Sequence, residues 1–306
     1  MSVEAAAEAL RNGGLVIMPT ETVYGLACDA TNPKAVARVY EAKGRPQLNP
    51  LIVHVPGMAQ AEEHAIFHEK AHKLALQFWP GPLTIVAPRR ADSTVSELAC
   101  AGLSTIAIRA PSHPIARQLM AAFGKPITAP SANRSGHVSA TTAEHAAADL
   151  GHAVDVVLDG GASPVGLEST IVAIDADGAA MLLRPGAIPR ADIEAIIGPL
   201  AAPSDPKRVS APGMLESHYA PRARVLLDVV TPPPGAAYLA FGAPAPAGGL
   251  TLSASGNLVE AAANLYAHLR ALDASGVETI AVAPIPAHGL GEAIADRLRR
   301  AAAPRG

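Results

Sequence analysis

The chain has 306 residues and a formal net charge of −3, and its 49% hydrophobic and 17% charged residues are typical of a soluble protein with two domains. Lysine and arginine are scattered along it, which argues against stable binding of a long nucleic acid. Cys28 and Cys100 stand far apart, which argues against a disulfide framework and a cysteine-based zinc site. The N-terminus is acidic and no run of about 18 apolar residues occurs, so we expect a cytoplasmic protein without a membrane anchor.

Residues 1–200 predict a mixed α/β domain. Apolar residues at helical spacing predict helices over 3–13 and 33–44, a long helix after Val55 that ends near Gln77, and a helix over 113–123. Short apolar runs predict strands at 15–18, 51–55, 83–87, 105–110, 126–129 and 154–158. Residues 169–175 and 180–184 predict an antiparallel hairpin that turns at Asp177–Gly178. Because some strands follow one another too closely for a helical crossover, the sheet should be mixed.

The rest of the chain predicts a linker and a small second domain. Residues 201–222 are rich in proline and show little periodicity, which is typical of a linker. A stiff linker of this length can either act as a lid over the first domain or serve as a passive tether. Residues 223–306 predict a three-layer α/β domain, with strands near 224–230, 236–241 and 278–283 and helices near 257–273 and 291–302.

Polar residues at two element ends are candidates for a ligand site. Thr20–Tyr24 follows a buried strand, at the kind of edge where α/β folds bind ligands, although a capped turn is the simpler interpretation. Lys43 and Arg45 flank the end of a predicted helix, and two cations at a proline-bounded turn suit a polyphosphate. Alternatively, Lys43 only complements the helix dipole.

Two arginines end apolar strands, Arg109 after 106–108 and Arg184 after 181–183. A buried arginine needs an anion, which is either a protein carboxylate or a ligand carboxylate, and the sequence leaves both open. Pro130–Asn133 follows another strand and can offer backbone N–H and hydroxyl donors to a phosphate.

Two further patterns favour structural interpretations. His64, His68 and His72 recur every four residues within the long predicted helix, but a solvated helix face is a simpler interpretation than a metal site, and we predict no metal site. Gly289-Leu290-Gly291 opens a helix after a strand, but it lacks the third glycine of a dinucleotide fingerprint.

Seven segments, taken in order, form a far more specific pattern: PTETVYGLA at 19–27, AKGRPQLNPLIVH at 42–54, WPGPLT at 79–84, STIAIRAPSHP at 104–114, APSAN at 129–133, GLESTIV at 166–172 and LLRPGAI at 182–188. This order resembles the YrdC-like threonylcarbamoyl-AMP synthases, and APGMLESHYAP at 211–221 marks their long, two-domain form. The resemblance spans nearly the whole chain. It implies a YrdC-type mixed-sheet domain with a large basic cavity and a small Rossmann-like C-terminal domain.

The resemblance also implies an activity: condensation of L-threonine, bicarbonate and ATP, with Mg²⁺, to threonylcarbamoyl-AMP and pyrophosphate. The product would pass to the machinery that transfers the threonylcarbamoyl group to a tRNA adenosine beside the anticodon. The positions that match threonine-binding places are Thr22, His54, Arg109, Ala129 and Ser169. Those that match nucleotide-binding places are Arg45, Asn49, Thr105, Ser131, Ser139, Arg184 and Tyr219. Lys43 and Arg45 match the basic motif expected to act in catalysis by neutralising phosphate charge.

One departure and two alternatives stand beside this expectation. Long-form relatives often carry a basic-aromatic pair after APGM, where this chain has Leu215 and Glu216. A YrdC-type domain can instead serve ATP-dependent carbamoylation of another substrate, although the threonine-side residues argue against this. The basic cavity of such a domain can also indicate double-stranded RNA binding, but the negative net charge of this chain disfavours that function.

Overall fold

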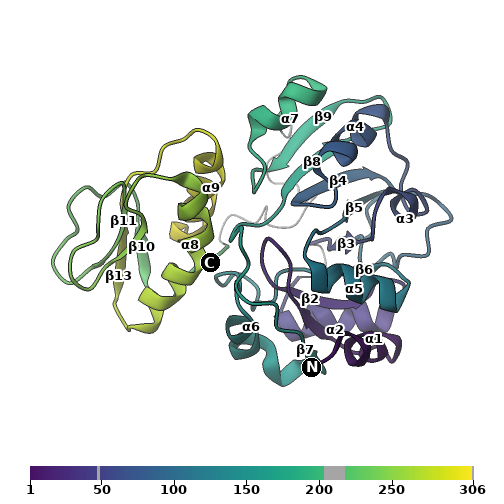
Figure 1. The fold of residues 1–306 in the computed structure, drawn as a ribbon, viewed down its shortest axis with the longest axis horizontal. Helices are drawn as coiled ribbons and strands as arrows, with labels where there is room; N and C mark the ends of the chain where they lie inside the picture. The colour runs from purple at the N-terminus through teal and green to yellow at the C-terminus, as the bar shows by residue number, and fades with distance from the viewer. Residues whose placement is uncertain (47–48, 203–217, 305–306) are drawn as a thin grey trace.

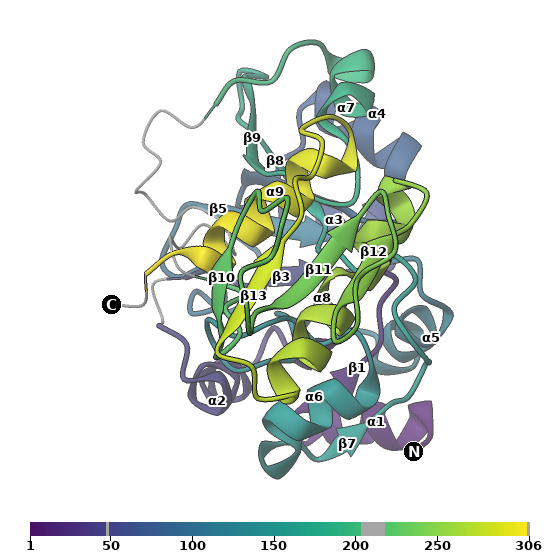
Figure 2. The ribbon, with the colours of Figure 1, turned by 90° about the vertical axis from the view of Figure 1, so that its left-hand side faces the viewer.

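The computed structural model describes residues 1–46, 49–202 and 218–304, which form a large and a small α/β domain (Figures 1 and 2). Residues 203–217 of the predicted linker, with Leu215 and Glu216, lie outside the described residues, and so does most of the predicted lid. Within the described part, no helix is both long and apolar enough to cross a membrane.

The large domain is built on a nine-stranded sheet with the order β7-β1-β2-β6-β3-β5-β4-β8-β9. Its strands are β1 Val16–Met18, β2 Gly25–Asp29, β3 Ile52–His54, β4 Leu83–Pro88, β5 Thr105–Arg109, β6 Ile127–Thr128, β7 Val156–Val157, β8 Thr170–Ile174 and β9 Ala180–Arg184. The pairs β1/β7, β3/β5 and β4/β8 are parallel and the other neighbours are antiparallel. The expected mixed sheet and the β8–β9 hairpin are therefore confirmed.

Most of the described helices of this domain begin at a residue whose side chain caps the first turn. They are α1 Val3–Arg11, α2 Pro33–Lys43, α3 Met58–Glu62, α4 Glu69–Phe78, α5 Pro114–Phe123, α6 Ala143–Leu150 and α7 Arg190–Ile197, with a short 3₁₀ turn at Gly151–Ala153. In α2 the Asn32 side chain accepts hydrogen bonds from the first turn, and Gly44 ends the helix in the left-handed conformation. Lys43 is the last residue of α2 and Arg45 follows its Gly44 cap, and both cations of the basic motif are buried there.

The prediction of one long helix that ends near Gln77 is wrong, because two helices, α3 and α4, occupy this region. Between them the chain bridges to the segment after β4: Ala65 pairs with Arg89, and the Ile66 N–H donates to the Pro88 carbonyl at 2.9 Å. The His68 side chain then caps α4. Apolar residues stand at helical spacing on both sides of the break. This local pattern did not predict the break, because the break depends on backbone pairing with residues about 25 positions away.

The two faces of the sheet have different partners. Leu83 and Ile85 of β4 pack with α4 and α7, whereas Val86 faces the opposite side together with Ile52 and Leu183. This second face is the one that leads to the pocket described below, because Ile52 also lines that pocket. The alternation of the strands thus separates a helix-covered face from a ligand-accessible face.

The small domain is a four-stranded parallel sheet with the order β10-β13-β11-β12. Its elements are β10 Arg224–Leu226, β11 Ala237–Phe241, β12 Leu250–Ser253, α8 Leu258–Ala274, β13 Thr279–Val282 and α9 Leu290–Ala302. Both helices lie on the face of the sheet that is turned toward the large domain, so this part has two layers and the three-layer expectation is wrong (Figures 1 and 2). Strand β12 has no counterpart among the strands expected from the sequence.

The two domains share one hydrophobic core. Val23, Val138 and Leu167 of the large domain belong to the same buried cluster as Leu265 and Ile294 of the helices α8 and α9. Gly166 brings the chains close, because a Cβ at this position would lie 2.5 Å from the Ala262 carbonyl oxygen. A side chain at position 166 would therefore collide with the backbone of α8.

Candidate active site

A pocket opens in the large domain where several strand ends meet. The neighbouring parallel strands β3 and β5 end in register with His54 opposite Arg109, and β9 brings Arg184 opposite Ile171, two residues after Ser169. The pocket is lined by Thr22, Val23, Arg45, Ile52, His54, Arg109, Ala129, Pro130, Ser131, Glu168, Ser169, Arg184, His218 and Tyr219. Nine of the predicted site residues thus come together from segments far apart in the sequence.

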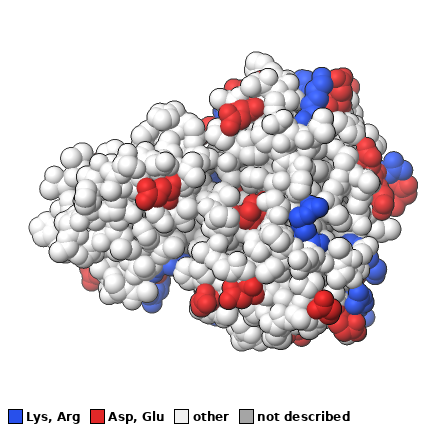
Figure 3. All heavy atoms as spheres, viewed as in Figure 1, with Lys and Arg blue, Asp and Glu red and all other residues white. Residues whose placement is uncertain are grey.

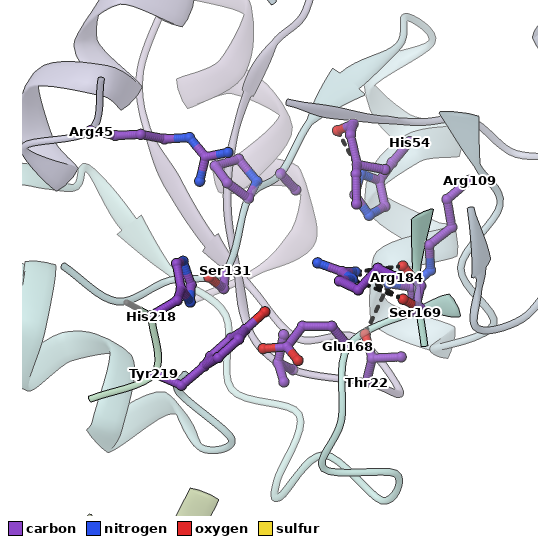
Figure 4. A pocket seen from close by; sticks show the side chains of 14 residues that line it. Thr22, Arg45, His54, Arg109, Ser131, Glu168, Ser169, Arg184, His218 and Tyr219 are labelled. Carbon is purple, nitrogen blue, oxygen red and sulfur yellow. Dashed lines mark hydrogen bonds between the residues drawn. The ribbon is translucent and has the colours of Figure 1, made fainter. Parts of the chain in front are cut away.

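The pocket has two sides (Figure 4). Arg45, His218 and Tyr219 lie on one side, and the cluster that contains Arg109, Ser169 and Thr22 lies on the other. The Arg184 side chain reaches from this cluster toward the middle of the pocket, between the two sides. Three guanidinium groups therefore face one space, which suits a ligand that carries several negative charges.

Arg109 is buried and already has a carboxylate partner. Its Nη2 donates to Glu21 Oε1 at 2.6 Å, its Nη1 to Thr22 Oγ1 at 2.9 Å, and its Nε to the Gly81 carbonyl at 3.3 Å. Glu21 also accepts from the Ser112 N–H. Glu21 was not predicted as a site residue, although it stands inside the PTET segment beside Thr22. Three of the five N–H groups of Arg109 bind the protein, and its direction is fixed by them.

His54 is buried and neutral. Burial, with Arg109 adding to it, lowers the pKa of His54 to about 3, and its Nδ1 lies 3.2 Å from the Ile52 carbonyl oxygen. A neutral ring that faces a carbonyl through Nδ1 carries its proton there, so Nε2 is an acceptor. Through Nε2 the ring can accept a hydrogen bond from an ammonium or hydroxyl group of a ligand.

Ser169 and Arg184 form one hydrogen-bonded unit. Arg184 donates to the Ser169 carbonyl and, at 3.1 Å, to its hydroxyl, which also lies 2.7 Å from Thr84 Oγ1. Thr84 is fully buried on β4 and was not predicted as a site residue; its place in WPGPLT was the available signal. This unit fixes both a guanidinium group and a hydroxyl at the pocket wall.

The two cations of the basic motif have different surroundings. Arg45 lines the pocket and donates to the Pro50 carbonyl at 3.0 Å; burial lowers its pKa to about 10, so it is charged at neutral pH. Lys43 does not line the pocket, and its Nζ donates to the carbonyls of Ser131 and Asn133. Burial, with Arg45 beside it, lowers the pKa of Lys43 well below its usual range. In this structure Lys43 therefore holds the turn that carries Ser131.

Three other predicted residues also lie outside the pocket lining. Asn49 is buried next to Arg45, which donates to its carbonyl. Thr105 begins β5, on the same face as Arg109 but at the other end of the strand. Ser139 lies behind the pocket and donates to Glu168 Oε1 at 2.6 Å. They surround the lining residues and do not form the pocket wall.

Glu168 and His218 line the pocket and were not predicted. Glu168 directly precedes Ser169 in GLEST, and His218 directly precedes Tyr219, so both stood inside quoted segments. Burial lowers the pKa of His218 to about 3, so this ring is neutral; the Glu168 carboxylate opposes the shift, and the nearby cations, Arg45 first, add to it. The backbone of Tyr219 has φ of 61°, and its ring lines the pocket beside the His218 ring.

The two weaker patterns have structural explanations. His64 lies after α3, His68 caps α4 and His72 lies within α4, so the three are not on one helix. Among the described residues, no three His, Cys, Asp or Glu side chains come together as a possible metal site. Gly289 forms the start of α9, and Gly291 packs against the Pro286 carbonyl, where a side chain would not fit.

Fold and pocket together define a two-domain α/β protein with a pocket lined by arginines and hydroxyl groups. A family model described as "Telomere recombination" (Sua5, YciO and YrdC) matches residues 8–186, and one described as "Threonylcarbamoyl-AMP synthase, C-terminal domain" matches residues 188–303. The chain belongs to the Sua5/YrdC family, in the form that carries the threonylcarbamoyl-AMP synthase C-terminal domain.

Curated relatives and a solved structure agree with this assignment. The threonylcarbamoyl-AMP synthase of Bacillus subtilis is 40% identical over 99% of this chain and 93% of its own length. That of Pyrococcus abyssi is 39% identical over 98% of this chain and 93% of its own length. The crystal structure of P. abyssi Sua5 complexed with L-threonine superposes with a TM-score of 0.90 and 37% identity, covering 98% of this chain and 94% of that one.

Proposed function

We propose that the chain is a threonylcarbamoyl-AMP synthase, which condenses L-threonine, bicarbonate and ATP and releases pyrophosphate. The observation that carries this proposal is the meeting of Arg45, Arg109 and Arg184 in one pocket with neutral His54 and the hydroxyl of Ser169. The names of the full-length relatives support the same reaction.

Threonine occupies the side of the pocket formed by Arg109, Thr22, Ser169, His54 and the backbone of Ala129. Arg109, held by Glu21, directs its remaining N–H groups toward the carboxylate of the amino acid. His54 accepts from the amine through Nε2, which orients the nitrogen lone pair toward bicarbonate. Discrimination against serine rests on one methyl group and is worth about 1–3 kcal/mol.

ATP occupies the side formed by Arg45, Arg184, Ser131 and Tyr219, with Asn49, Thr105 and Ser139 around it. The threonine nitrogen attacks the carbon of bicarbonate, water leaves, and an oxygen of the resulting carbamate attacks the α-phosphorus of ATP with loss of pyrophosphate. No residue of the chain forms a covalent bond in this sequence. The chain contributes proximity and, through Arg45 and Arg184, neutralisation of phosphate charge. Lys43 contributes by holding the 131–133 turn, which carries Ser131.

Mg²⁺ enters this reaction as the complex with ATP, whose phosphates supply ligands to it. The two carboxylates nearest the pocket do not fit a resident metal site, because Glu21 binds Arg109 and Glu168 binds Arg297. We therefore assign no step to a metal held by the protein.

The product serves, in this proposal, the cytoplasmic machinery that transfers the threonylcarbamoyl group to tRNA. The face in Figure 3 carries acidic and basic side chains scattered singly and in small groups, which supports an indirect relation to RNA. ATP-dependent carbamoylation of another substrate and RNA binding are the alternatives that the assay must separate.

The test incubates the protein with ATP, Mg²⁺, bicarbonate and labelled amino acids and follows pyrophosphate and adenylate products. We expect pyrophosphate release that requires threonine, and a threonylcarbamoyl-AMP product. Arg45→Ala should lower turnover by about 10-fold or more, because a charged contact to the polyphosphate is lost. Arg38→Ala, which removes an exposed cation from α2, the helix that precedes Arg45, should leave turnover unchanged.

Two results would contradict the proposal. Pyrophosphate release that is independent of threonine would favour the other carbamoylation. Binding of double-stranded RNA without any turnover would favour the RNA-binding alternative.

A further inference from the structure

Glu168 is a buried acidic residue at the wall of a pocket whose other charged lining residues are arginines. Its side chain lies near Tyr219 and Arg184 and is 6% exposed (Figure 4). A bare carboxylate at this place would repel the phosphates of a nucleotide. The donors that surround Glu168 therefore decide whether the pocket favours an anion.

Two of these donors come from the small domain. Arg297 Nε of α9 donates to Glu168 Oε2 at 2.8 Å, and the Tyr266 hydroxyl of α8 lies 2.8 Å from Oε2 and 3.0 Å from Oε1. Ser139 supplies the third donor. Burial alone would raise the pKa of Glu168, but Arg297, Arg184 and Ser139 together lower it to about 2, so the carboxylate is ionised and paired.

The same two residues also hold Tyr219. The Arg297 guanidinium lies 5.1 Å from the centre of the Tyr219 ring, and the Tyr266 ring stacks on it at 5.7 Å between centres. Arg297 is fixed in turn by Asp296 Oδ2 at 2.6 Å and by the Pro185 carbonyl at 2.9 Å. Its side chain is fully buried, so its charge acts within the protein.

We propose that Arg297 and Tyr266 are positioning residues through which the small domain completes the nucleotide side of the pocket. They neutralise the Glu168 carboxylate, so that it does not repel the polyphosphate, and they hold the Tyr219 ring against the pocket. The inference rests on the proposed function for the identity of the ligand, ATP. It assigns to the small domain an electrostatic task in a reaction whose other residues lie in the large domain and the linker.

Tyr266→Phe tests this directly, because it removes one donor to Glu168 and keeps the ring that stacks on Tyr219. Direct calorimetry should show ATP binding weakened by about 5-fold or more, with threonine binding unchanged, since the lost hydrogen bond joins a hydroxyl and a charged group. Tyr238→Phe is the matched control, because its hydroxyl donates to the Val229 carbonyl within the small domain, away from the pocket. Equal ATP affinity of the two variants would overturn the proposal.

A charge-specific rescue separates positioning from general packing. Glu168→Gln keeps the size of the side chain and removes its charge, so adding it to Tyr266→Phe should restore part of the lost ATP affinity. A purely structural role of Tyr266 predicts no restoration, and that result would also overturn the proposal.

Arg297→Lys provides an independent variant, which keeps a positive charge but loses the fork that reaches Glu168, Asp296 and Pro185 together. It should weaken ATP binding while threonine binding persists, whereas Arg299→Lys on the exposed side of α9 should change neither. An Arg297→Lys protein that binds ATP as the control does would contradict the inference. Failure of the proposed function is distinct: it appears in the unaltered protein as pyrophosphate release without threonine dependence, while ATP binding is measured separately.

Discussion

Arg109 has a protein carboxylate as its partner and is also expected to bind the carboxylate of threonine. Replacing it with alanine would leave Glu21 buried and unpaired, at a cost of about 3–5 kcal/mol, so instability would hide the binding effect. Arg109→Lys keeps the charge beside Glu21 and loses the planar fork. We expect threonine affinity in calorimetry to fall by about 10-fold or more, with ATP affinity unchanged.

The control for this variant is Arg117→Lys on the exposed face of α5, which should bind threonine normally. If Arg109→Lys loses stability but keeps threonine affinity, the role of Arg109 is to pair with Glu21. The assignment of Arg109 to the threonine carboxylate is then wrong.

At the residue scale the sequence predicted most of the pocket and little of what supports it. Arg109 and Arg184 were recognisable because a cation at the end of an apolar strand needs an anion. The resemblance then assigned their neighbours. Arg297 and Tyr266 gave no such signal, since each stands within an ordinary amphipathic helix and gains its meaning only from the docking of α8 and α9 on Glu168.

At the scale of elements, prediction worked where local signals were sufficient. The Asn32 cap and Gly44 gave both ends of α2, and Asp177–Gly178 gave the β8–β9 turn. It did not find β2, β12, α6 or α7, and it merged α3 with α4, where the pairing of Ala65 with Arg89 joins chain segments that are distant in sequence.

Gly166 permits the closest approach between the large domain and α8, and this contact can be tested by itself. Gly166 has φ of +71° and Gly161 has φ of +76°, but only Gly166 meets backbone atoms of Ala262 and Ala263 within 3 Å of an added Cβ. Gly161→Ala should lower the free energy of unfolding by about 1–2 kcal/mol through backbone strain. Gly166→Ala should cost about 1–3 kcal/mol more, because α8 must move.

Urea unfolding of both variants measures this difference, and the backbone strain cancels between them. Equal unfolding free energies would mean that α8 is not pressed against the 166–168 turn, which would also weaken the case for a fixed Glu168 network.

At the scale of the molecule, the small domain is joined to the large one by a shared core and by charge, and the two links have different consequences. Loss of the shared core exposes Val23, Val138 and Leu167 and lowers stability. Loss of the charged link leaves Glu168 without two of its donors. The other core clusters of the large domain lie entirely within residues 1–200, so this domain keeps most of its own interior.

A chain shortened after Ala202 should therefore fold, because it keeps these clusters and the Met181–Ala201 bridge that ends the sheet. Its threonine side is intact, since Thr22, His54, Arg109 and Ser169 remain, and we expect threonine affinity close to that of the full chain. ATP affinity should fall by more than in Tyr266→Phe, about 10-fold or more, because Tyr219 and both donors to Glu168 are removed together. Removal of residues 303–306 alone, which leaves α9 complete, should change neither affinity. Calorimetry with ATP and with threonine measures both affinities. Full ATP affinity in the shortened chain would mean that the large domain builds the nucleotide site alone. Loss of threonine affinity would mean that the small domain supports the whole pocket and not only its nucleotide side.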